Sequence, residues 1–481
     1  FDFSYTGRGL LMCLENAKNW PKAPLIKAMR PILQIKPKLN MDDETQSLYW
    51  AFILLSSQNR GHIISLPIHK ILARLLQGVE NNQNIVLQAE PGAGKSTVVP
   101  LALLKADFLA GQRIIMLEPR RMAVRSIANY LARCLGERVG QTVGYQVKNE
   151  RKISASTRLE IITEGVLTRR LQSNPELDGV GLIIFDEFHE RSINTDLSLM
   201  LSLEIQQVIR EDLRLLVMSA TLDTGLMSAY LNDAPVILCE GRSYPVSVAY
   251  KKIDARQLAL HVCQAIRGVI DDEGDILVFL PGTADIKRCV SQAESMLLEH
   301  PQFKCVPLHG SLPLAEQEKA ISLAPPGIQK IIFTTNIAET SLTIEGIRCV
   351  IDSGLERTLS FSPASGMSKL TTTKISKASA EQRKGRAGRL SAGKCVRLWS
   401  ESEHRSLNDF QQEEILNADL ADALLELASA GHSNYHEINW LTAPPKAHFD
   451  STQTVLINLG LLEKQGRITE LGQQACALPV H

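Results

Sequence analysis

The chain has 481 residues, of which 44% are hydrophobic and 22% charged, and its 52 basic and 52 acidic side chains give a formal net charge of zero. This length is too great for one hydrophobic core and predicts about three domains of an ordinary globular protein. The neutral balance excludes a bulk electrostatic attraction to nucleic acid, so any such binding must come from local basic clusters.

The sequence carries no signal for secretion or membrane insertion. The longest strongly apolar run near the start, 48–55, is too short to span a bilayer, and no segment has the pattern of a signal peptide. The nine cysteines form no C-x-x-C pair, which argues against a disulfide framework and against a zinc site. These features predict a protein of the reducing cytoplasm with no membrane partner.

Residues 1–65 are the least informative part of the chain. Glycines and prolines interrupt them, and the lysines and arginines between 27 and 38 make them locally basic. A basic arm can contact nucleic acid, but a solvated, poorly ordered arm is the commoner case and is our expectation. The chain begins with Phe1 and stops in mid-pattern at His481, so we expect a cut or non-native amino end and a truncated carboxyl end.

Short apolar runs then alternate with helical patterns, the first helix being expected from Ser65. Nearly continuous apolar runs are typical of strands buried on both faces, in a parallel sheet covered by helices. The expected strands form two series, at 85–88, 113–117, 159–163, 181–185 and 213–219, and at 276–280, 305–308, 330–335, 349–352 and 395–399. Two tandem α/β domains follow, with the link between them at 234–245.

After residue 400 the pattern becomes helical. We interpret the leucine-rich stretch 415–427 as domain core, and 456–462 with 467–471 as a further small module. His432 and His436 have the spacing of two metal ligands on a helix, but without a third ligand nearby a surface pair is the preferred interpretation. The predicted divisions of the chain are 1–65 (unassigned), 66–236, 237–402 and 403–481.

A glycine-rich turn follows the first expected strand and precedes a helix. Its glycines let the backbone curl with the N–H groups inward, and the helix that begins near Lys95 adds the positive end of its dipole. In such a P-loop, Lys95 reaches the phosphates and Ser96 contacts Mg²⁺. The general pattern has Gly where this chain has Ala89, so a glycine-rich turn with an incidental lysine is the alternative. The candidate nucleotide-binding residues are Ala89, Glu90, Pro91, Gly92, Ala93, Gly94, Lys95, Ser96 and Thr97.

Two carboxylates end the expected strand 181–185. Asp186 is a candidate to hold Mg²⁺, and Glu187 is a candidate to orient and deprotonate a water molecule. Together with Ser96 they are the candidate metal ligands, and His189 could link this site to its neighbours. An acidic turn after a buried strand is the alternative, which is weaker because a P-loop is also present.

Two further stretches suit a phosphate-driven motor. Ser219 and Thr221 follow another expected strand, where hydroxyls either cap a helix or relay the state of a nucleotide. Arg383, Arg386 and Arg389 are separated by small residues, and guanidinium groups match phosphate oxygens. If the two α/β domains face each other, Arg386 and Arg389 can act as arginine fingers on a nucleotide; the alternative is a basic RNA-binding loop or a solvated run of charges.

The chain resembles the DEAH/DExH-box branch of the superfamily-2 helicases, especially the HrpB-type bacterial ATP-dependent helicases. The likeness extends from about residue 66 to 471, and Phe188 stands where the usual family spelling has Ala, as in HrpB-type proteins. The stretches that carry it, in the family's order, are 89–96, 119–123, 163–169, 186–189, 219–221, 279–282, 334–343 and 382–389.

The resemblance implies two RecA-like domains with ATP and Mg²⁺ in the cleft between them, followed by a helical and winged-helix module. It implies a strand-separating hairpin at 353–373 and a nucleotide-stacking role for Tyr130. The implied catalytic residues are Lys95, Glu187, Gln382, Arg386 and Arg389, and His189, Ser219 and Thr221 are implied in coupling. The implied contacts to nucleic acid are Arg120, Arg121, Thr163, Arg169, Gly282, Thr335 and Thr343.

The expected function is therefore an ATP-dependent RNA helicase or translocase that moves 3′ to 5′ on a single strand. A clamp that remodels nucleic acid without unwinding it, and a DNA translocase, are the alternatives. RNA rests on the resemblance alone, because no feature of the sequence reads a 2′-hydroxyl group. No protein partner is indicated.

Overall fold

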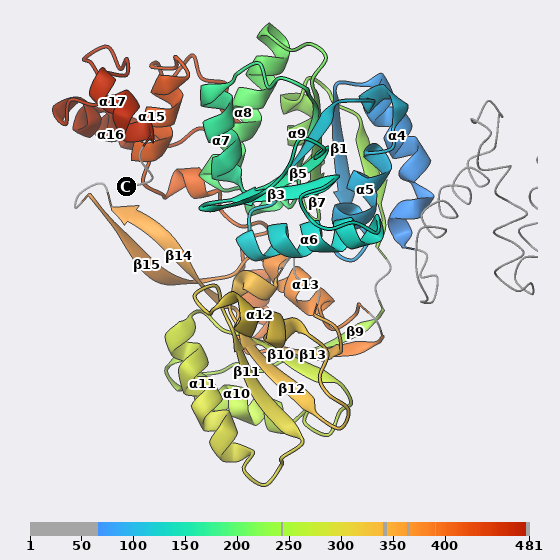
Figure 1. Cartoon of the computed structure of the whole chain (residues 1–481). Coiled ribbons are helices and arrows are strands. Elements are labelled where there is room, and N and C mark those ends of the chain that lie inside the picture. The colour runs from blue at the N-terminus through green and yellow to red at the C-terminus, as the bar shows by residue number, and fades with distance from the viewer. Residues whose placement is uncertain (1–65, 242–243, 340–343, 363–365, 390, 478–481) are drawn as a thin grey trace, which may run out of the picture.

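A computed structural model describes residues 66–241, 244–339, 344–362, 366–389 and 391–477. Two α/β domains stand one above the other, and the C-terminal helices lie beside the first of them (Figure 1). The segment expected at 1–65 lies outside the described residues. The expected α/β class with two parallel sheets and a helical C-terminal region is confirmed.

The first domain is built on an eight-stranded sheet with the order β4-β3-β5-β2-β6-β7-β1-β8, and β3–β4 is its only antiparallel pair. Alternate residues of each central strand enter opposite cores; Val86 packs on one face and Ile85 and Leu87 on the other. The strands are β1 (Asn84–Ala89), β2 (Arg113–Leu117), β3 (Val143–Val147), β4 (Glu150–Lys152), β5 (Leu159–Ile162), β6 (Val180–Phe185), β7 (Arg214–Ser219) and β8 (Val236–Cys239). The helices that cover them are α4 (Leu72–Asn81), α5 (Lys95–Leu103), α6 (Arg121–Cys134), α7 (Glu164–Ser173), α8 (Ile193–Val208) and α9 (Thr224–Tyr230).

The second domain contains a six-stranded, fully parallel sheet with the order β11-β12-β10-β13-β16-β9. Its strands are β9 (Val246–Tyr250), β10 (Asp275–Phe279), β11 (Phe303–Leu308), β12 (Gln329–Thr334), β13 (Ile347–Asp352) and β16 (Gly393–Arg397). Its helices are α10 (Leu258–Arg267), α11 (Thr283–Met296), α12 (Leu314–Ile321) and α13 (Lys377–Gly385), and η7 (Asn336–Ala338) follows β12.

The domain boundary differs from the expectation. The expected link 234–245 contains β8, which pairs with β1 at the edge of the first sheet, so the expected boundary at 236 falls inside a strand. The chain crosses between the sheets after Cys239 and before Val246. The four residues of β8 are all apolar, but their burial alternates because an edge strand has one solvated face; Leu238 is 59% exposed.

A two-stranded antiparallel hairpin leaves the second domain and points toward the C-terminal helices (Figure 1). Its strands are β14 (Leu355–Ser362) and β15 (Met367–Lys374), as the sequence predicts for 353–373. The central residues of the expected turn, 363–365, lie outside the described residues.

The C-terminal region packs on the first domain. Ile415, Leu424 and Phe449 share one hydrophobic core with Phe188 and Leu197, so the leucine-rich stretch is core, as expected. His432, expected to be half of a surface pair, has Nε2 2.7 Å from Glu204 Oε2. Its elements are α14 (Glu401–Arg405), η8 (Glu414–Leu416), α15 (Ala421–Ser429), α16 (Lys446–Asn458) and α17 (Glu470–Ala477). Within the described ranges, no helix has the length and apolar character needed to cross a bilayer.

The contact between α15 and α7 generates a pH-dependent prediction. Burial and the Asp422 carboxylate raise the pKa of Glu426 to about 7, although Arg169 opposes them. An unfolded glutamate titrates near ~4.3, so the folded chain holds more protons between these values and its stability falls as pH rises through that window. Glu426→Gln removes this loss, and we expect a higher thermal midpoint than the wild type at pH 8 and an equal one at pH 4.

The matched control is Glu463→Gln, because Glu463 is an exposed glutamate of the same region. It should leave the midpoint unchanged at both pH values. A Glu426→Gln midpoint that differs from the wild type equally at pH 4 and pH 8 would contradict the titration of Glu426.

Candidate functional site

The P-loop turn lies between β1 and α5, as predicted. Gly92 and Gly94 have φ of 83° and 98°, where glycine is favoured. A Cβ atom on Gly94 would lie 2.9 Å from Leu66 Cδ1, whereas one on Gly92 would meet nothing within 4 Å. The turn is therefore packed at Gly94 and open at Gly92. Of the other expected residues, Ala89 ends β1, the turn contains Glu90, Pro91 and Ala93, and the first turn of α5 contains Ser96 and Thr97.

Lys95 is buried against both carboxylates that follow β6. Its Nζ lies 2.8 Å from Glu187 Oε2 and 3.9 Å from Asp186 Oδ1. Glu187 has φ of 51°, an unusual value for a non-glycine residue, and its N–H donates to Asp186 Oδ1 at 2.9 Å. This left-handed turn brings two adjacent carboxylates to one lysine.

The two carboxylates have opposite acid–base behaviour. Burial raises the pKa of Asp186, and Lys95 and a hydrogen bond from Ser96 only partly offset it. Burial also opposes ionisation of Glu187, but Lys95 and His189 outweigh it and lower its pKa. Among the described residues, Asp186 Oδ2 is buried and has no hydrogen-bond partner. A buried carboxylate oxygen in that state, beside a serine hydroxyl, fits the oxygen ligands that Mg²⁺ prefers.

The second domain presents two buried arginines to the same place. Burial and the neighbouring Arg389 lower the pKa of Arg386, and Glu187 opposes this; Arg386 Nε also donates to the backbone carbonyl of Glu339 at 3.0 Å. Burial lowers the pKa of Arg389 to about 10, again against Glu187. Guanidinium groups are suited to bind the oxygens of a phosphate group.

A chain of polar contacts joins Glu187 to the second domain. His189 Nδ1 lies 3.5 Å from Glu187 Oε2 and 3.3 Å from Ser219 Oγ. The Ser219 hydroxyl donates to the Thr221 carbonyl at 2.8 Å, and Gln382 Nε2 donates to the Thr221 hydroxyl at 3.3 Å. Burial lowers the pKa of His189, so the imidazole in this chain is neutral near pH 7. The residues predicted for coupling are thus brought into one path between the domains.

Arg120 differs from the expected contact to nucleic acid. Its Nη1 donates to the carbonyls of Asn336 and Ile337 at 2.8 and 2.7 Å, across the boundary between the domains. Its Nη2 lies 3.0 Å from Glu190 Oε1. The guanidinium group is engaged by three acceptors in this structure, so it ties the domains together instead of facing a strand.

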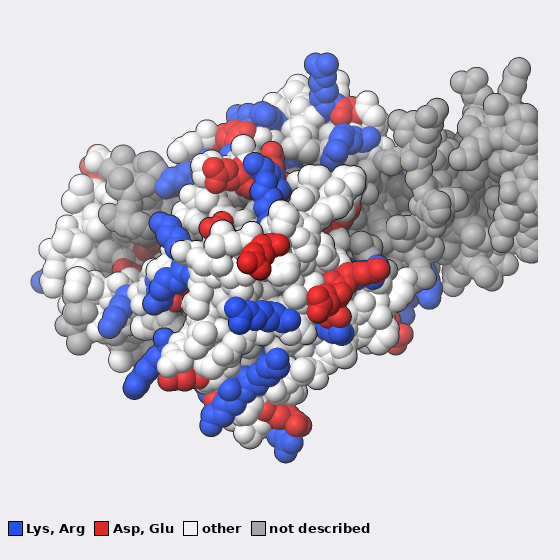
Figure 2. All heavy atoms as spheres, turned by 90° about the horizontal axis from the view of Figure 1, so that it is seen from below, with Lys and Arg blue, Asp and Glu red and all other residues white. Residues whose placement is uncertain are grey.

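The other residues predicted to contact nucleic acid lie on the surface or directly before helices. Arg121 and Arg169 are exposed; Thr163, Gly282 and Thr335 are the residues that precede α7, α11 and η7. Thr343 lies outside the described residues. The face in Figure 2 shows basic and acidic side chains interspersed and not one basic patch, in keeping with the neutral composition.

Tyr130, the candidate for nucleotide stacking, lies on α6 with 46% of its surface exposed. Its described partner is Cys134, one turn further on. Within the described part of the chain, no contact joins it to the P-loop turn.

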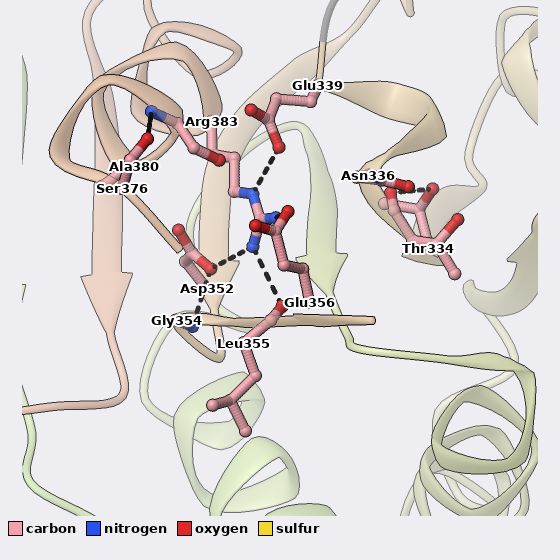
Figure 3. A network of polar contacts seen from close by, with 12 residues as sticks. Thr334, Asn336, Glu339, Asp352, Gly354, Leu355, Glu356, Ser376, Ala380 and Arg383 are labelled. Atoms are coloured by element: carbon pink, nitrogen blue, oxygen red, sulfur yellow. Dashed lines mark hydrogen bonds and ion pairs between the residues drawn. The ribbon is translucent and has the colours of Figure 1, made fainter. Parts of the chain in front are cut away.

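Sequence reasoning missed the buried surroundings of Arg383, which contacts Glu339, Asp352 and Glu356 (Figure 3). Arginine at 383 was recognised, but its carboxylate partners come from three separate elements, and no local spacing signals them.

Two family descriptions match the chain: "DEAD/DEAH box helicase" over residues 69–228 and "Helicase conserved C-terminal domain" over 259–391. The chain is 43% identical over 419 residues to the ATP-dependent RNA helicase HrpB of Escherichia coli (strain K12), covering 86% of this chain and 51% of that protein. It is 35% identical over 420 residues to the ATP-dependent RNA helicase HrpA of Borreliella burgdorferi, with coverage of 86% and 51%.

A solved structure agrees with these matches. The crystal structure of Escherichia coli DEAH/RHA helicase HrpB superimposes with a TM-score of 0.80 and 43% identity, covering 86% of this chain and 52% of that one. The chain therefore spans about half the length of the curated relatives it matches.

Arg120 provides a test of the contact between the domains. Arg120→Gln removes charge-assisted hydrogen bonds that contribute together about 2 kcal/mol, so we expect the separated arrangement of the domains to become about thirtyfold more populated. Small-angle X-ray scattering should report a larger radius of gyration than for the wild type. Arg405→Gln, which removes an exposed arginine paired with Glu401, is the control and should leave it unchanged. Equal radii for wild type and Arg120→Gln would contradict the role of Arg120.

Proposed function

Because the chain belongs to the DEAD/DEAH-box helicases, we propose that it is an ATP-dependent RNA helicase. It hydrolyses ATP between its two α/β domains and moves 3′ to 5′ along single-stranded RNA. One observation carries the proposal: Lys95 pairs with Glu187 in the first domain, and the buried Arg386 of the second domain is near enough for its charge to interact with that of Glu187. The domain names and the names of the relatives agree with it.

The residues of the P-loop and of β6 are suited to hold ATP and Mg²⁺. The open turn at Gly92 offers backbone N–H groups to phosphate oxygens. Asp186 and Ser96 would hold Mg²⁺, which when bound offsets the charge of the phosphates. The Asp186 oxygen that has no hydrogen-bond partner among the described residues supports this assignment.

Glu187 acts as the base in the proposed hydrolysis. Without nucleotide it is held by Lys95, and the negative phosphates compete for Lys95 when ATP binds. The released carboxylate accepts a proton from water as the water oxygen bonds to the γ-phosphorus. The bond from that phosphorus to the bridging oxygen breaks, and ADP and phosphate leave. Arg386 and Arg389 stabilise the charge on the transferring group.

The path from Glu187 through His189, Ser219 and Thr221 to Gln382 supports coupling between hydrolysis and movement of the domains. Strand contacts by Arg121, Thr163, Arg169, Gly282, Thr335 and Thr343 remain part of the proposal. Contacts of this kind reach phosphate and sugar, so they give little preference for sequence. The unpaired thiols at the eight described cysteines support the cytoplasmic location that belongs to the same proposal.

Glu187→Gln tests the proposed chemistry. The amide keeps the shape of the side chain but cannot accept the proton, so we expect ATP to bind and its turnover to fall by about 10²–10⁴-fold. Steady-state phosphate release and equilibrium binding of a fluorescent ATP analogue measure the two effects separately. Turnover equal to that of the wild type would remove Glu187 from the role of base.

Strand displacement separates the helicase from its alternatives. The chain should release the labelled strand of an RNA duplex with a 3′ single-stranded tail when ATP and Mg²⁺ are present. RNA-stimulated hydrolysis without release would favour a clamp, and release from DNA but not RNA would favour a DNA translocase.

A further inference from the structure

Arg383 is an almost completely buried charged group outside the nucleotide site. It lies on α13, one turn before Arg386, and its side chain is 1% exposed. Three carboxylates surround it: Nε is 2.9 Å from Glu339 Oε2, Nη1 is 3.0 Å from Asp352 Oδ1, and Nη2 is 3.8 Å from Glu356 Oε2 (Figure 3). The guanidinium plane also lies against the ring of Phe279, 5.0 Å from its centroid.

Arg383 is connected to the nucleotide cleft through residue 339. The side chain of Glu339 accepts from Arg383, and its backbone carbonyl accepts from Arg386 at 3.0 Å. Two arginines on successive turns therefore hold one residue, and Arg386 in turn faces Glu187. Arg383 lies on α13 and Arg386 is the residue that caps its end, so a shift of Arg386 is expected to displace Arg383 as well.

Arg383 also contacts the base of the β14–β15 hairpin. Its Nη1 donates to the carbonyl of Leu355 at 3.3 Å, and Nη2 faces Glu356, so it touches the first two residues of β14. Asp352 accepts from the N–H of Gly354 at 2.9 Å, which shapes the turn into the hairpin. Of the three carboxylates, Glu356 has the longest contact and is the one that belongs to the hairpin itself.

The hairpin is held again further along β14. The Phe361 N–H donates to the carbonyl of Asn417 at 2.7 Å, and the Phe361 ring stacks on His448 with centroids 5.0 Å apart. The C-terminal region that supplies these partners is bound to the first domain, where the Ile193 N–H donates to Glu414 and Arg191 donates to Thr442. The hairpin thus spans from α13 of the second domain to a region fixed on the first (Figure 1).

From this arrangement we propose that Arg383 and Glu356 couple the nucleotide cleft to the β14–β15 hairpin, with Glu356 as a positioning residue that sets the hairpin against α13. When the two domains rearrange around a nucleotide, α13 moves relative to the first domain. The base of the hairpin contacts α13, and Phe361 contacts the C-terminal region that is fixed on the first domain. This movement must therefore rotate or strain the hairpin. The effect of this coupling on RNA rests on the proposed function, whereas the coupling between the nucleotide and the hairpin does not.

Hydrogen exchange of the full chain tests the proposal without RNA. Amide exchange in β14 and β15 is compared with and without a non-hydrolysable ATP analogue and Mg²⁺. We expect the analogue to change the exchange rate of these amides by about fivefold or more in the wild type, within the usual range of coupling between sites. Glu356→Gln keeps the shape but removes the charge that Arg383 attracts, and it should reduce the change to less than about twofold.

Two further variants make the test specific. Phe361→Ala releases the other attachment and should have the same effect, and the double variant should be no worse than the stronger single one, because both act on one path. Glu273→Gln, an 88% exposed glutamate paired with Arg348 in the same domain, is the control and should behave as the wild type. If Glu356→Gln does not fold, Phe361→Ala tests the path alone.

The proposal would be overturned if the nucleotide-dependent change in amide exchange persisted in Glu356→Gln or in Phe361→Ala. It would also be overturned if the double variant lost more of that change than the stronger single variant. The same variants are then assayed for the ratio of ATP turnover with and without single-stranded RNA. We expect turnover without RNA to stay within about twofold of the wild type and the stimulation by RNA to fall. A wild type that RNA does not stimulate contradicts the proposed function, whereas wild-type stimulation in Glu356→Gln contradicts only this coupling.

Discussion

The site between the domains depends on buried charge. Lys95 pairs with Glu187 within the first domain, and the buried Arg386 of the second domain is near enough for Glu187 to oppose the lowering of its pKa. A phosphate group bound beside these cations would attract both domains at once. Phosphate groups that enter and leave would therefore change the spacing of the domains, which is what a nucleotide-driven motor requires.

Two structural paths carry that change away from the cleft. One runs through His189 and Thr221 to Gln382 and uses short polar contacts between the domains. The other runs through Arg383 to the base of the hairpin and uses buried charge. Both begin on α13 or next to it, so this helix would connect the proposed hydrolysis with the proposed movement of the domains.

The central strands and the P-loop could be predicted because their signals are local: a continuous apolar run, then glycines, then a lysine. The edge strand β8 could not, because a run of four apolar residues between the two domains does not distinguish a strand from a link. The contact of Arg120 with the carbonyls of Asn336 and Ile337 could not be predicted either. Every residue has a backbone carbonyl, and the sequence does not indicate which carbonyl an arginine contacts. The same holds for Glu356, whose partner is close in space and distant in the chain.

The most direct measurement is the steady-state rate of ATP hydrolysis with and without single-stranded RNA or DNA, using Lys95→Ala as the blank. The account predicts a rate that depends on Lys95 and that RNA raises more than DNA does. Hydrolysis that persists in Lys95→Ala, or a Lys95-dependent rate that neither strand changes, would contradict the claim that this cleft is a nucleotide site coupled to nucleic acid.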